Sequence, residues 1–315
     1  MEAKIRSSRE EALARSENHL GRFILTSAII LTALAVTAVF GISAYVGWNL
    51  THPGREKIEY YPDAAGLVYE DVSFKSREGG LNLKGWLIQA RDSEKTIIFA
   101  HGYRKNRLNN DVPILPIATA MVNKGYNVLM FDFRNCGESE GNLTSVGQYE
   151  VLDLLGAIDF IKSKPELSQK LVLYGFSMGA AVTIMAGARE QAVTAVIADS
   201  PFADLKSYLM KNLGVWTNLP SFPFNQSFLV VVPPLTGLRT ETVSPIKEIK
   251  NFNGRPVLLI HGEADTDIPI ENSELLQIEY HKAQLLRVPG AKHIKAFATD
   301  SNYYLEAVSN FLDTL

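Results

Sequence analysis

The most constraining stretch of the chain is a short apolar run followed by Gly-x-Ser-x-Gly and several small residues. Residues 171–181 read Leu-Val-Leu-Tyr-Gly-Phe-Ser-Met-Gly-Ala-Ala. This order predicts a buried strand that turns sharply into a helix, which leaves no room for Cβ atoms at Gly175 and Gly179. Ser177 at the apex would be held in a strained conformation with its side chain projecting outward. We therefore take Ser177 as a candidate nucleophile, with an ordinary strand-to-helix turn as the alternative.

A long uncharged segment lies near the N-terminus. Residues 23–48 contain no charged side chain, and a helix needs roughly 20 apolar residues to cross a bilayer. Five basic residues precede this segment, against Arg55 and Lys57 just after it. The positive-inside rule then predicts a single-pass protein of the cell membrane, with residues 1–22 cytoplasmic and residues 50–315 outside. A cleaved signal peptide is the alternative, but its apolar region is usually only about 7–15 residues long.

Beyond a polar linker at residues 49–67, we expect one domain over residues 68–315. Short unbroken apolar runs alternate there with segments of helical periodicity, which is typical of a parallel sheet covered on both faces. The predicted fold class is α/β, with a mostly parallel eight-stranded sheet, helices on both faces and a cap insertion at about residues 202–255. The expected strands are residues 71–76, 81–90, 96–100, 126–131, 171–174, 193–198, 256–260 and 284–288.

A serine nucleophile needs a base to take its proton, and the base needs an orienting carboxylate. His293 follows the last predicted strand. It is therefore expected at the carboxyl ends of the strands, where ligands bind in such folds. We therefore select it as the base from the six histidines. His101 and His261 remain alternatives, although each ends a strand directly before glycine, where an imidazole more often bonds to the turn.

The carboxylate is expected between the serine and the histidine, after an intervening strand. Asp265 follows the strand at residues 256–260 and is our choice. Asp267 and Glu263 lie in the same turn and are also open, and Asp199 is a further alternative.

The attacked carbonyl becomes an oxyanion, which needs two preorganised N–H donors. One such donor comes from the residue after the nucleophile, here Met178, and the other usually comes from the loop after the third strand. That loop contains Tyr103, so we predict the backbone N–H groups of Met178 and Tyr103 as the oxyanion hole.

Five motifs in this order resemble the α/β-hydrolase superfamily, and within it the membrane-anchored Bem46-like and bacterial serine-hydrolase group. They are His101-Gly102, Asp132-x-Arg134-x-x-Gly137-x-Ser139-x-Gly141, Gly175-x-Ser177-x-Gly179, His261-Gly262-x-x-Asp265-x-x-Ile268-Pro269 and Gly290-x-x-His293. The resemblance covers about residues 68–315 and implies a Ser177–Asp265–His293 triad with Tyr103 and Met178 as oxyanion donors. One departure is that many relatives have glycine at the position of Asn135 or Cys136.

The substrate is less well defined, because this superfamily includes esterases, lipases, thioesterases, peptidases and acyltransferases. Aromatic and valine-rich residues in the cap insertion favour an apolar pocket for an acyl ester, including a lipid-like one. They could equally form the core of the cap itself, or dip into the outer leaflet beside the anchor. We expect a serine hydrolase acting on carboxylic esters, with a serine peptidase or acyltransferase as the alternative and a non-catalytic envelope binding protein as the alternative of another class.

Composition excludes several further functions. A net charge of −3 gives no electrostatic case for nucleic-acid binding. The single cysteine, Cys136, excludes an intrachain disulfide and cysteine-cluster metal sites. Triad chemistry needs neither a metal nor an organic cofactor, so we expect none. Protein partners are not indicated by any motif.

Overall fold

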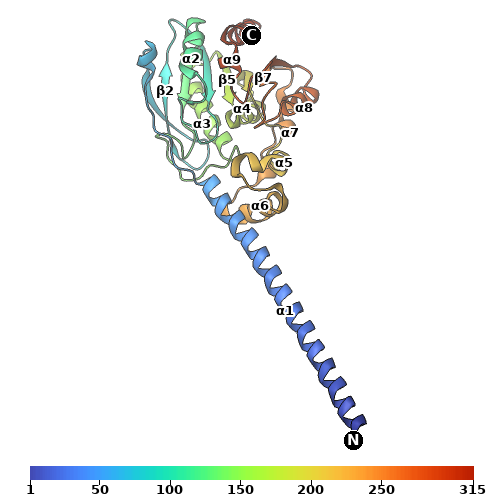
Figure 1. The fold of residues 1–315 in the computed structure, drawn as a ribbon. Coiled ribbons are helices and arrows are strands. Elements are labelled where there is room, and N and C mark those ends of the chain that lie inside the picture. The colour runs from blue at the N-terminus through green and yellow to red at the C-terminus, as the bar shows by residue number, and fades with distance from the viewer.

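One very long helix projects from an α/β body (Figure 1). The computed structural model describes the backbone of all 315 residues, and the side chains of all but residues 2, 3, 7, 10–12, 14 and 17. Helix α1 (Glu2–Thr51) takes in the charged N-terminal segment and the predicted anchor without interruption. Within it, Asn18–Thr51 is a stretch long and apolar enough, by length and composition, to cross a membrane.

The body is built on a sheet with the order β1-β2-β4-β3-β5-β6-β7-β8. The first three strands in this order pair antiparallel and the others pair parallel, which confirms the predicted mostly parallel eight-stranded sheet. The strands are β1 (Glu70–Lys75), β2 (Asn82–Ile88), β3 (Lys95–Ala100), β4 (Asn127–Phe131), β5 (Lys170–Phe176), β6 (Val193–Asp199), β7 (Val257–Gly262) and β8 (Ala283–Val288).

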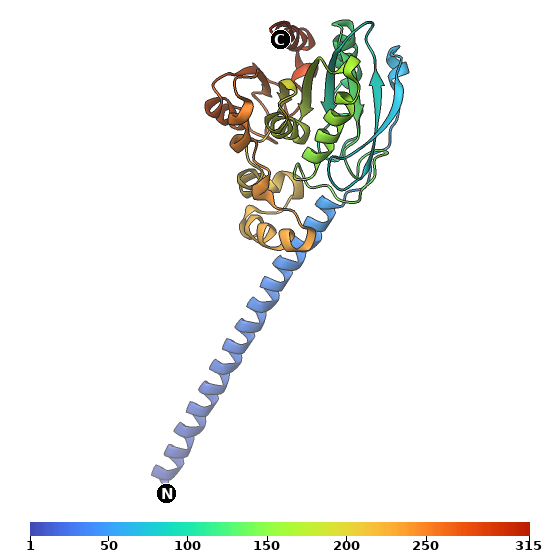
Figure 2. The same cartoon turned by 180° about the vertical axis from the view of Figure 1, so that it is seen from behind.

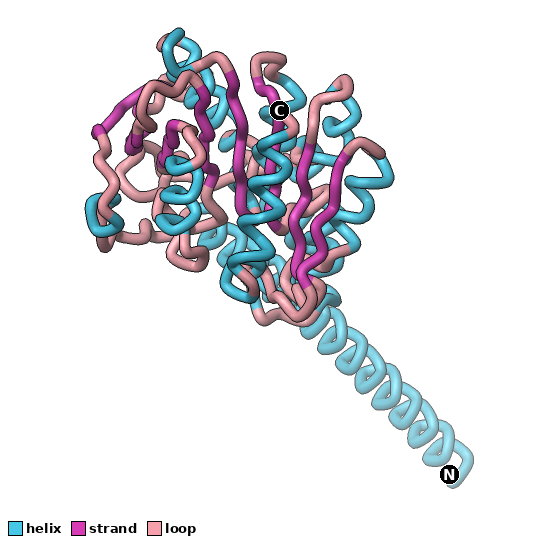
Figure 3. The backbone as a smooth tube through the Cα atoms, turned by 90° about the horizontal axis from the view of Figure 1, so that it is seen from above, coloured by secondary structure: helices cyan, strands magenta, loops and turns pink.

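Helices cover both faces of this sheet (Figure 3). On one face lie α3 (Glu150–Lys162), α4 (Met178–Arg189) and α8 (Glu271–Glu279), and on the other α2 (Ile114–Asn123), α9 (Ala296–Thr299) and α10 (Ser301–Asp313). Successive strand residues therefore enter opposite cores: Leu173 packs with the first group and Val172 with the second. This explains why the strands are unbroken apolar runs rather than alternating ones.

Between β6 and β7 the chain forms a cap of helices. It contains α5 (Leu205–Thr217), α6 (Ser221–Thr236) and α7 (Pro245–Glu248), with short 3-10 turns at Thr240–Thr242 and Ile249–Phe252. Helix α6 lies beside α1 where α1 meets the body (Figure 2). The two are joined by a 2.7 Å hydrogen bond between the Ser43 and Ser227 hydroxyls, and Gly47 allows Val232 to pack directly on the α1 backbone.

Helix α3 begins later than the sequence pattern suggests. The amphipathic pattern extends over residues 146–162, but α3 begins at Glu150. Val146 and Gly147 have φ values of 52° and 119°, which a helix does not allow. The Glu150 carboxylate accepts hydrogen bonds from the Ser145 and Gly147 N–H groups, at 2.8 and 2.7 Å. It satisfies the turn before the helix, as an acidic residue near a helix N-terminus commonly does.

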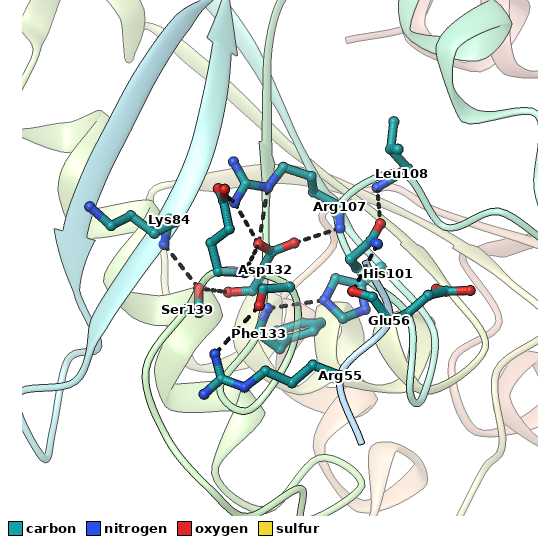
Figure 4. A network of polar contacts seen from close by, with 12 residues as sticks. Arg55, Glu56, Lys84, His101, Arg107, Leu108, Asp132, Phe133 and Ser139 are labelled. Atoms are coloured by element: carbon teal, nitrogen blue, oxygen red, sulfur yellow. Dashed lines mark hydrogen bonds and ion pairs between the residues drawn. The ribbon is translucent and has the colours of Figure 1, made fainter. Parts of the chain in front are cut away.

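A buried ion pair braces the loop after β4. Asp132 accepts hydrogen bonds from the backbone N–H of Arg107, at 2.7 Å, and from its guanidinium Nη2, at 2.5 Å (Figure 4). Arg107 and Asp132 are 1% and 0% exposed. In the same network, the Phe133 N–H donates to His101 Nε2 at 3.0 Å, which connects this loop to the end of β3. Asp132 therefore holds together the two loops that follow neighbouring strands.

We predict that Asp132→Asn lowers the free energy of unfolding by about 3–5 kcal/mol, because it leaves the Arg107 charge buried without its main partner. Glu138, the other carboxylate bonded to Arg107, is 56% exposed and compensates poorly. Chemical unfolding of the detergent-solubilised chain would measure the loss. The matched control is Glu248→Gln, which breaks the half-exposed Arg189–Glu248 pair and should cost no more than about 1 kcal/mol. Equal losses in both variants would contradict this interpretation.

Candidate active site

Ser177 lies at the sharp turn between β5 and α4. Its φ and ψ are 54° and −119°, outside the conformations that serine ordinarily adopts. A Cβ atom at Gly175 would collide with the Gly179 backbone, and one at Gly179 would collide with the backbone of Ala100 at the end of β3. A 2.8 Å hydrogen bond from the Ser177 N–H to the Asp199 carbonyl fixes the turn to β6. The strained serine is therefore held by its neighbours on both sides.

The structure brings His293 and Asp265 to this serine from two other loops. His293 Nε2 lies 2.9 Å from Ser177 Oγ, and His293 Nδ1 lies 2.7 Å from Asp265 Oδ2. Because a carboxylate only accepts hydrogen bonds, Nδ1 carries the imidazole proton and Nε2 is free to accept the serine proton. Hydrogen bonds thus connect the three side chains in the order Ser177, His293, Asp265, which is the order that nucleophilic catalysis requires.

Asp265 is held as the charged form. Burial would raise the pKa of this carboxyl, but hydrogen bonds from His261, His293 and the Ile268 N–H outweigh burial and hold it at about 2. Oδ1 accepts from the backbone N–H groups of Asp267 and Ile268, at 3.0 and 2.9 Å. These two bonds leave Oδ2 directed to His293, and they explain why Asp265 occupies this position rather than a neighbouring acid.

The two alternative bases, His101 and His261, have both ring nitrogens bonded to other groups. His101 Nε2 accepts the Phe133 N–H and its Nδ1 bonds to the Gly102 carbonyl, at 2.8 Å, and burial lowers its pKa. His261 Nδ1 lies 2.7 Å from the Ser273 hydroxyl, and its Nε2 is shared between the Ile268 carbonyl, at 2.8 Å, and Asp265 Oδ2, at 3.3 Å. His261 is thus a second partner of Asp265, a role that its position before a glycine did not reveal.

The alternative carboxylates are also separate from His293. Asp199 accepts hydrogen bonds from the Ser200 and Tyr304 hydroxyls, both at 3.0 Å. Glu263 is exposed in its turn, and the side chain of Asp267 lines the outer mouth of the site. Among the described residues, none of these three carboxylates forms a hydrogen bond with the His293 ring, whose Nδ1 bonds to Asp265.

The predicted oxyanion donors lie on the two segments nearest Ser177. Met178 is the first residue of α4, where a backbone N–H has no partner inside its helix. Tyr103 follows Gly102, whose backbone passes so close that a Cβ built on it would lie 3.6 Å from Ser177 Cβ. Both N–H groups therefore belong to backbone adjacent to Ser177.

An apolar pocket opens onto Ser177. Leu209, Leu213 and Trp216 of α5 and Phe228 of α6 form much of its wall, so the cap residues do face the site. A second, more polar space leads from Ser177 outward past Arg104, Lys105 and Asp111. Ser177 and Tyr103 line both spaces, and the serine therefore stands between an apolar pocket and a polar mouth.

The last turn of α1 is part of this pocket, which the sequence pattern did not indicate. Leu50 and Thr51 line the wall, and the Tyr103 hydroxyl donates a hydrogen bond to the Leu50 carbonyl. The Thr144 N–H donates to the Thr51 carbonyl at 2.7 Å. The long helix is thus bonded to the loop that carries a predicted oxyanion donor.

The described residues contain no cluster of His, Cys, Asp or Glu side chains able to hold a metal ion. Cys136 is buried, and burial raises the pKa of its thiol well above the ordinary value. The thiol is therefore uncharged at neutral pH, which makes it a poor nucleophile.

The chain has relatives in bacteria and eukaryotes. It is 31% identical over 239 residues to YqkD of Bacillus subtilis, covering 75% of this chain and 77% of that protein. Bem46 of Schizosaccharomyces pombe is 26% identical over 68% of this chain and 67% of its own length. The solved structure of the Pyrococcus furiosus esterase Pf2001 matches 84% of this chain and 98% of that one, with a TM-score of 0.70 and 28% identity. This chain belongs to the α/β-hydrolase superfamily, among the Bem46-like proteins.

A family model adds a second comparison. The X-Pro dipeptidyl-peptidase (S15 family) model matches residues 82–224 of this hydrolase, which include the Tyr103 loop and the Ser177 turn. The esterases and peptidases among these relatives support the conclusion that this chain is a serine hydrolase in general terms, acting on small-molecule substrates.

We predict that Asp199 makes the stability of this hydrolase fall with rising pH. Burial raises the Asp199 pKa to about 6, from an ordinary value of 3.8. The folded chain therefore binds this proton more tightly, and ionisation of Asp199 removes stability as the pH rises from about 4 to 6. The pKa of Asp265 is lowered, so the contribution of Asp265 to the stability of the fold changes only at pH values below this range.

The measurement is the melting temperature of the wild type and Asp199→Asn from pH 4 to 7. The variant should lose the part of the decline that ionisation of Asp199 causes, and its curve should be flatter than that of the wild type. Parallel curves would show that Asp199 does not titrate in this range.

Proposed function

We propose that this hydrolase is a membrane-anchored serine carboxylesterase that works through an acyl-enzyme. The observation that carries the proposal is the position of Ser177, whose Oγ lies 2.9 Å from His293 Nε2 and which lines an apolar pocket. A base at hydrogen-bonding distance activates the hydroxyl, and the apolar pocket suits the acyl chain of an ester.

In the proposed reaction, His293 takes the Ser177 proton as Oγ attacks the ester carbonyl, and Asp265 stabilises the resulting imidazolium. The N–H groups of Met178 and Tyr103 hold the oxyanion. His293 then gives its proton to the departing alcohol, which leaves through the polar mouth. Water then attacks the acyl carbonyl and loses a proton to His293, which returns a proton to Ser177 Oγ as the C–Oγ bond breaks and the acid leaves.

The proposed location follows from α1. A single apolar helix would anchor the chain in the cell membrane through residues 23–48. The five basic residues before it favour a cytoplasmic N-terminus and a catalytic domain on the opposite side. Because Leu50 and Thr51 line the pocket, an uncleaved anchor would keep the site close to the membrane surface.

A serine peptidase is the second candidate, and the match to the X-Pro dipeptidyl-peptidase family favours it. A peptidase that recognises a free amino terminus needs an unpaired carboxylate near the serine. The apolar pocket offers none. Of the three carboxylates that line the mouth, Glu56 and Asp111 pair with Lys105, so Asp267 is the one that could bind an amine. Because the pocket beside Ser177 is lined by apolar side chains that suit an acyl chain, we place the ester above the peptide, and an acyltransferase or a non-catalytic binding protein below both.

Ser177→Ala should lower kcat for p-nitrophenyl esters by about 10³-fold or more, because the residual rate comes only from binding and the oxyanion donors. The matched control is Cys136→Ala, which removes the other potential nucleophile and should leave kcat near the wild-type value. Undiminished hydrolysis by Ser177→Ala would refute the proposed nucleophile.

The apolar pocket predicts a preference for longer acyl chains. Each methylene buried in it contributes about 0.8 kcal/mol, so kcat/KM should rise roughly fourfold per carbon until the pocket is full. Leu209→Trp narrows the pocket and should shift the best substrate to a shorter chain while acetyl ester hydrolysis persists. Equal kcat/KM from acetyl to dodecanoyl esters in the wild type would argue against a shaped acyl pocket.

A further inference from the structure

The cap carries an unusually long segment without charge. Residues 212–238, which include the end of α5 and all of α6, contain no Asp, Glu, Lys, Arg or His. Yet much of α6 is uncovered: Phe222 is 81% exposed and Val230 is 62% exposed. A surface helix in water normally has charged and polar residues on its outer face, so this outer face is suited to a different solvent.

The other face of α6 is already occupied. Phe228 lines the pocket beside Ser177, and Val232 and Ser227 pack on α1. The exposed apolar side chains of α6 are therefore additional to those that the cap needs for its own core. They are continuous with α1, since Phe222, Pro223 and Val230 form an open apolar groove together with Val36 and Phe40 of α1.

The depth of this groove follows from helix geometry. The rise of 1.5 Å per residue places Phe40 about 27 Å along α1 from Arg22, the last charged residue before the apolar run. The hydrocarbon core of a bilayer is about 30 Å thick. If Arg22 lies at the cytoplasmic interface, the groove lies within the outer part of the hydrocarbon, and a span shifted toward Trp48 would place it deeper.

We infer that α6 inserts into the bilayer beside α1, with Phe222, Val230 and the α1–α6 groove in contact with lipid acyl chains. Such a helix would be buried about 5–10 Å below the headgroups, as interfacial helices are. This inference rests on the proposed anchoring of α1. Helix α6 then separates the lipid from the Ser177 pocket, and an ester dissolved in the leaflet reaches the serine along the cap rather than from bulk water.

The test measures the depth of single residues in the full-length chain. Val230→Cys and Gln226→Cys, both at the groove, are made in a Cys136→Ala background and labelled with a thiol-reactive NBD fluorophore. The matched control is Ile278→Cys on α8, where the side chain is 65% exposed. Leu31 is 66% exposed on α1, and Leu31→Cys reports whether the anchor itself spans the bilayer. Each protein is reconstituted in vesicles of phosphatidylcholine and phosphatidylglycerol.

Labels at positions 226 and 230 should lose most of their fluorescence when the phosphatidylcholine carries a nitroxide on its acyl chain, as should the label at position 31. The fluorescence of these labels should not be quenched by aqueous iodide. The label at position 278 should instead be quenched by iodide and not by the lipid nitroxide. The depth measurement does not depend on hydrolysis, so failure of the esterase proposal would leave it interpretable.

Three results would overturn the inference. Quenching of positions 226 and 230 by iodide alone, with position 31 quenched by lipid, would place the cap in water. Protection of both positions from lipid nitroxide and iodide would indicate that a second copy of the chain covers the groove. A label at position 31 that lipid does not quench would refute the anchoring of α1 and the inference with it.

A functional arm uses Val230→Asp, with Ile278→Asp as control. The charge at position 230 should reduce hydrolysis of a long-chain ester embedded in vesicles, and leave p-nitrophenyl acetate hydrolysis in detergent unchanged. Equal rates on the embedded ester for the wild type and Val230→Asp would count against delivery through the membrane.

Discussion

The architecture of this site depends on the absence of Cβ atoms at Gly175 and Gly179. Without side chains there, the end of β5 turns directly into α4 and packs against the backbone at the end of β3. This close approach brings Ser177 next to Gly102 and the Tyr103 loop, so the nucleophile and a predicted oxyanion donor meet through backbone contacts alone. The strain at Ser177 is sustained for two reasons. The Asp199 carbonyl of β6 accepts a hydrogen bond from the Ser177 N–H, and the residues of β5 and α4 on either side of it are buried in the core.

The second organising contact is between the long helix and the cap. Helix α1 contributes Leu50 and Thr51 to the pocket, and its Ser43 and Gly47 hold α6 through a hydrogen bond and a close approach. The Tyr103 hydroxyl bonds to the Leu50 carbonyl, so helix, cap and site are one connected unit. The proposed anchor would in this way influence which substrates reach the serine as well as where the protein resides.

Much of this arrangement could be predicted from the sequence because the determining signals are local. Apolar runs specified the eight strands, and the order of the Ser177, Asp265 and His293 motifs along the chain indicated which side chains would meet. The sequence contained no physical reason for choosing Asp265 over Asp267, because that reason is two backbone N–H groups that fold around Asp265 Oδ1. The contact of Leu50 with Tyr103 was also not predictable, because no periodicity connects residues so far apart in the chain.

The account is tested most directly by locating a covalent adduct. The full-length hydrolase would be treated with a fluorophosphonate, digested, and mapped by mass spectrometry. We expect one modified residue, Ser177, with a rate that falls sharply in His293→Ala because the serine then lacks the base that takes its proton. Modification of another residue, or an unchanged rate without the His293 imidazole, would contradict the central claim that these side chains act as one catalytic unit.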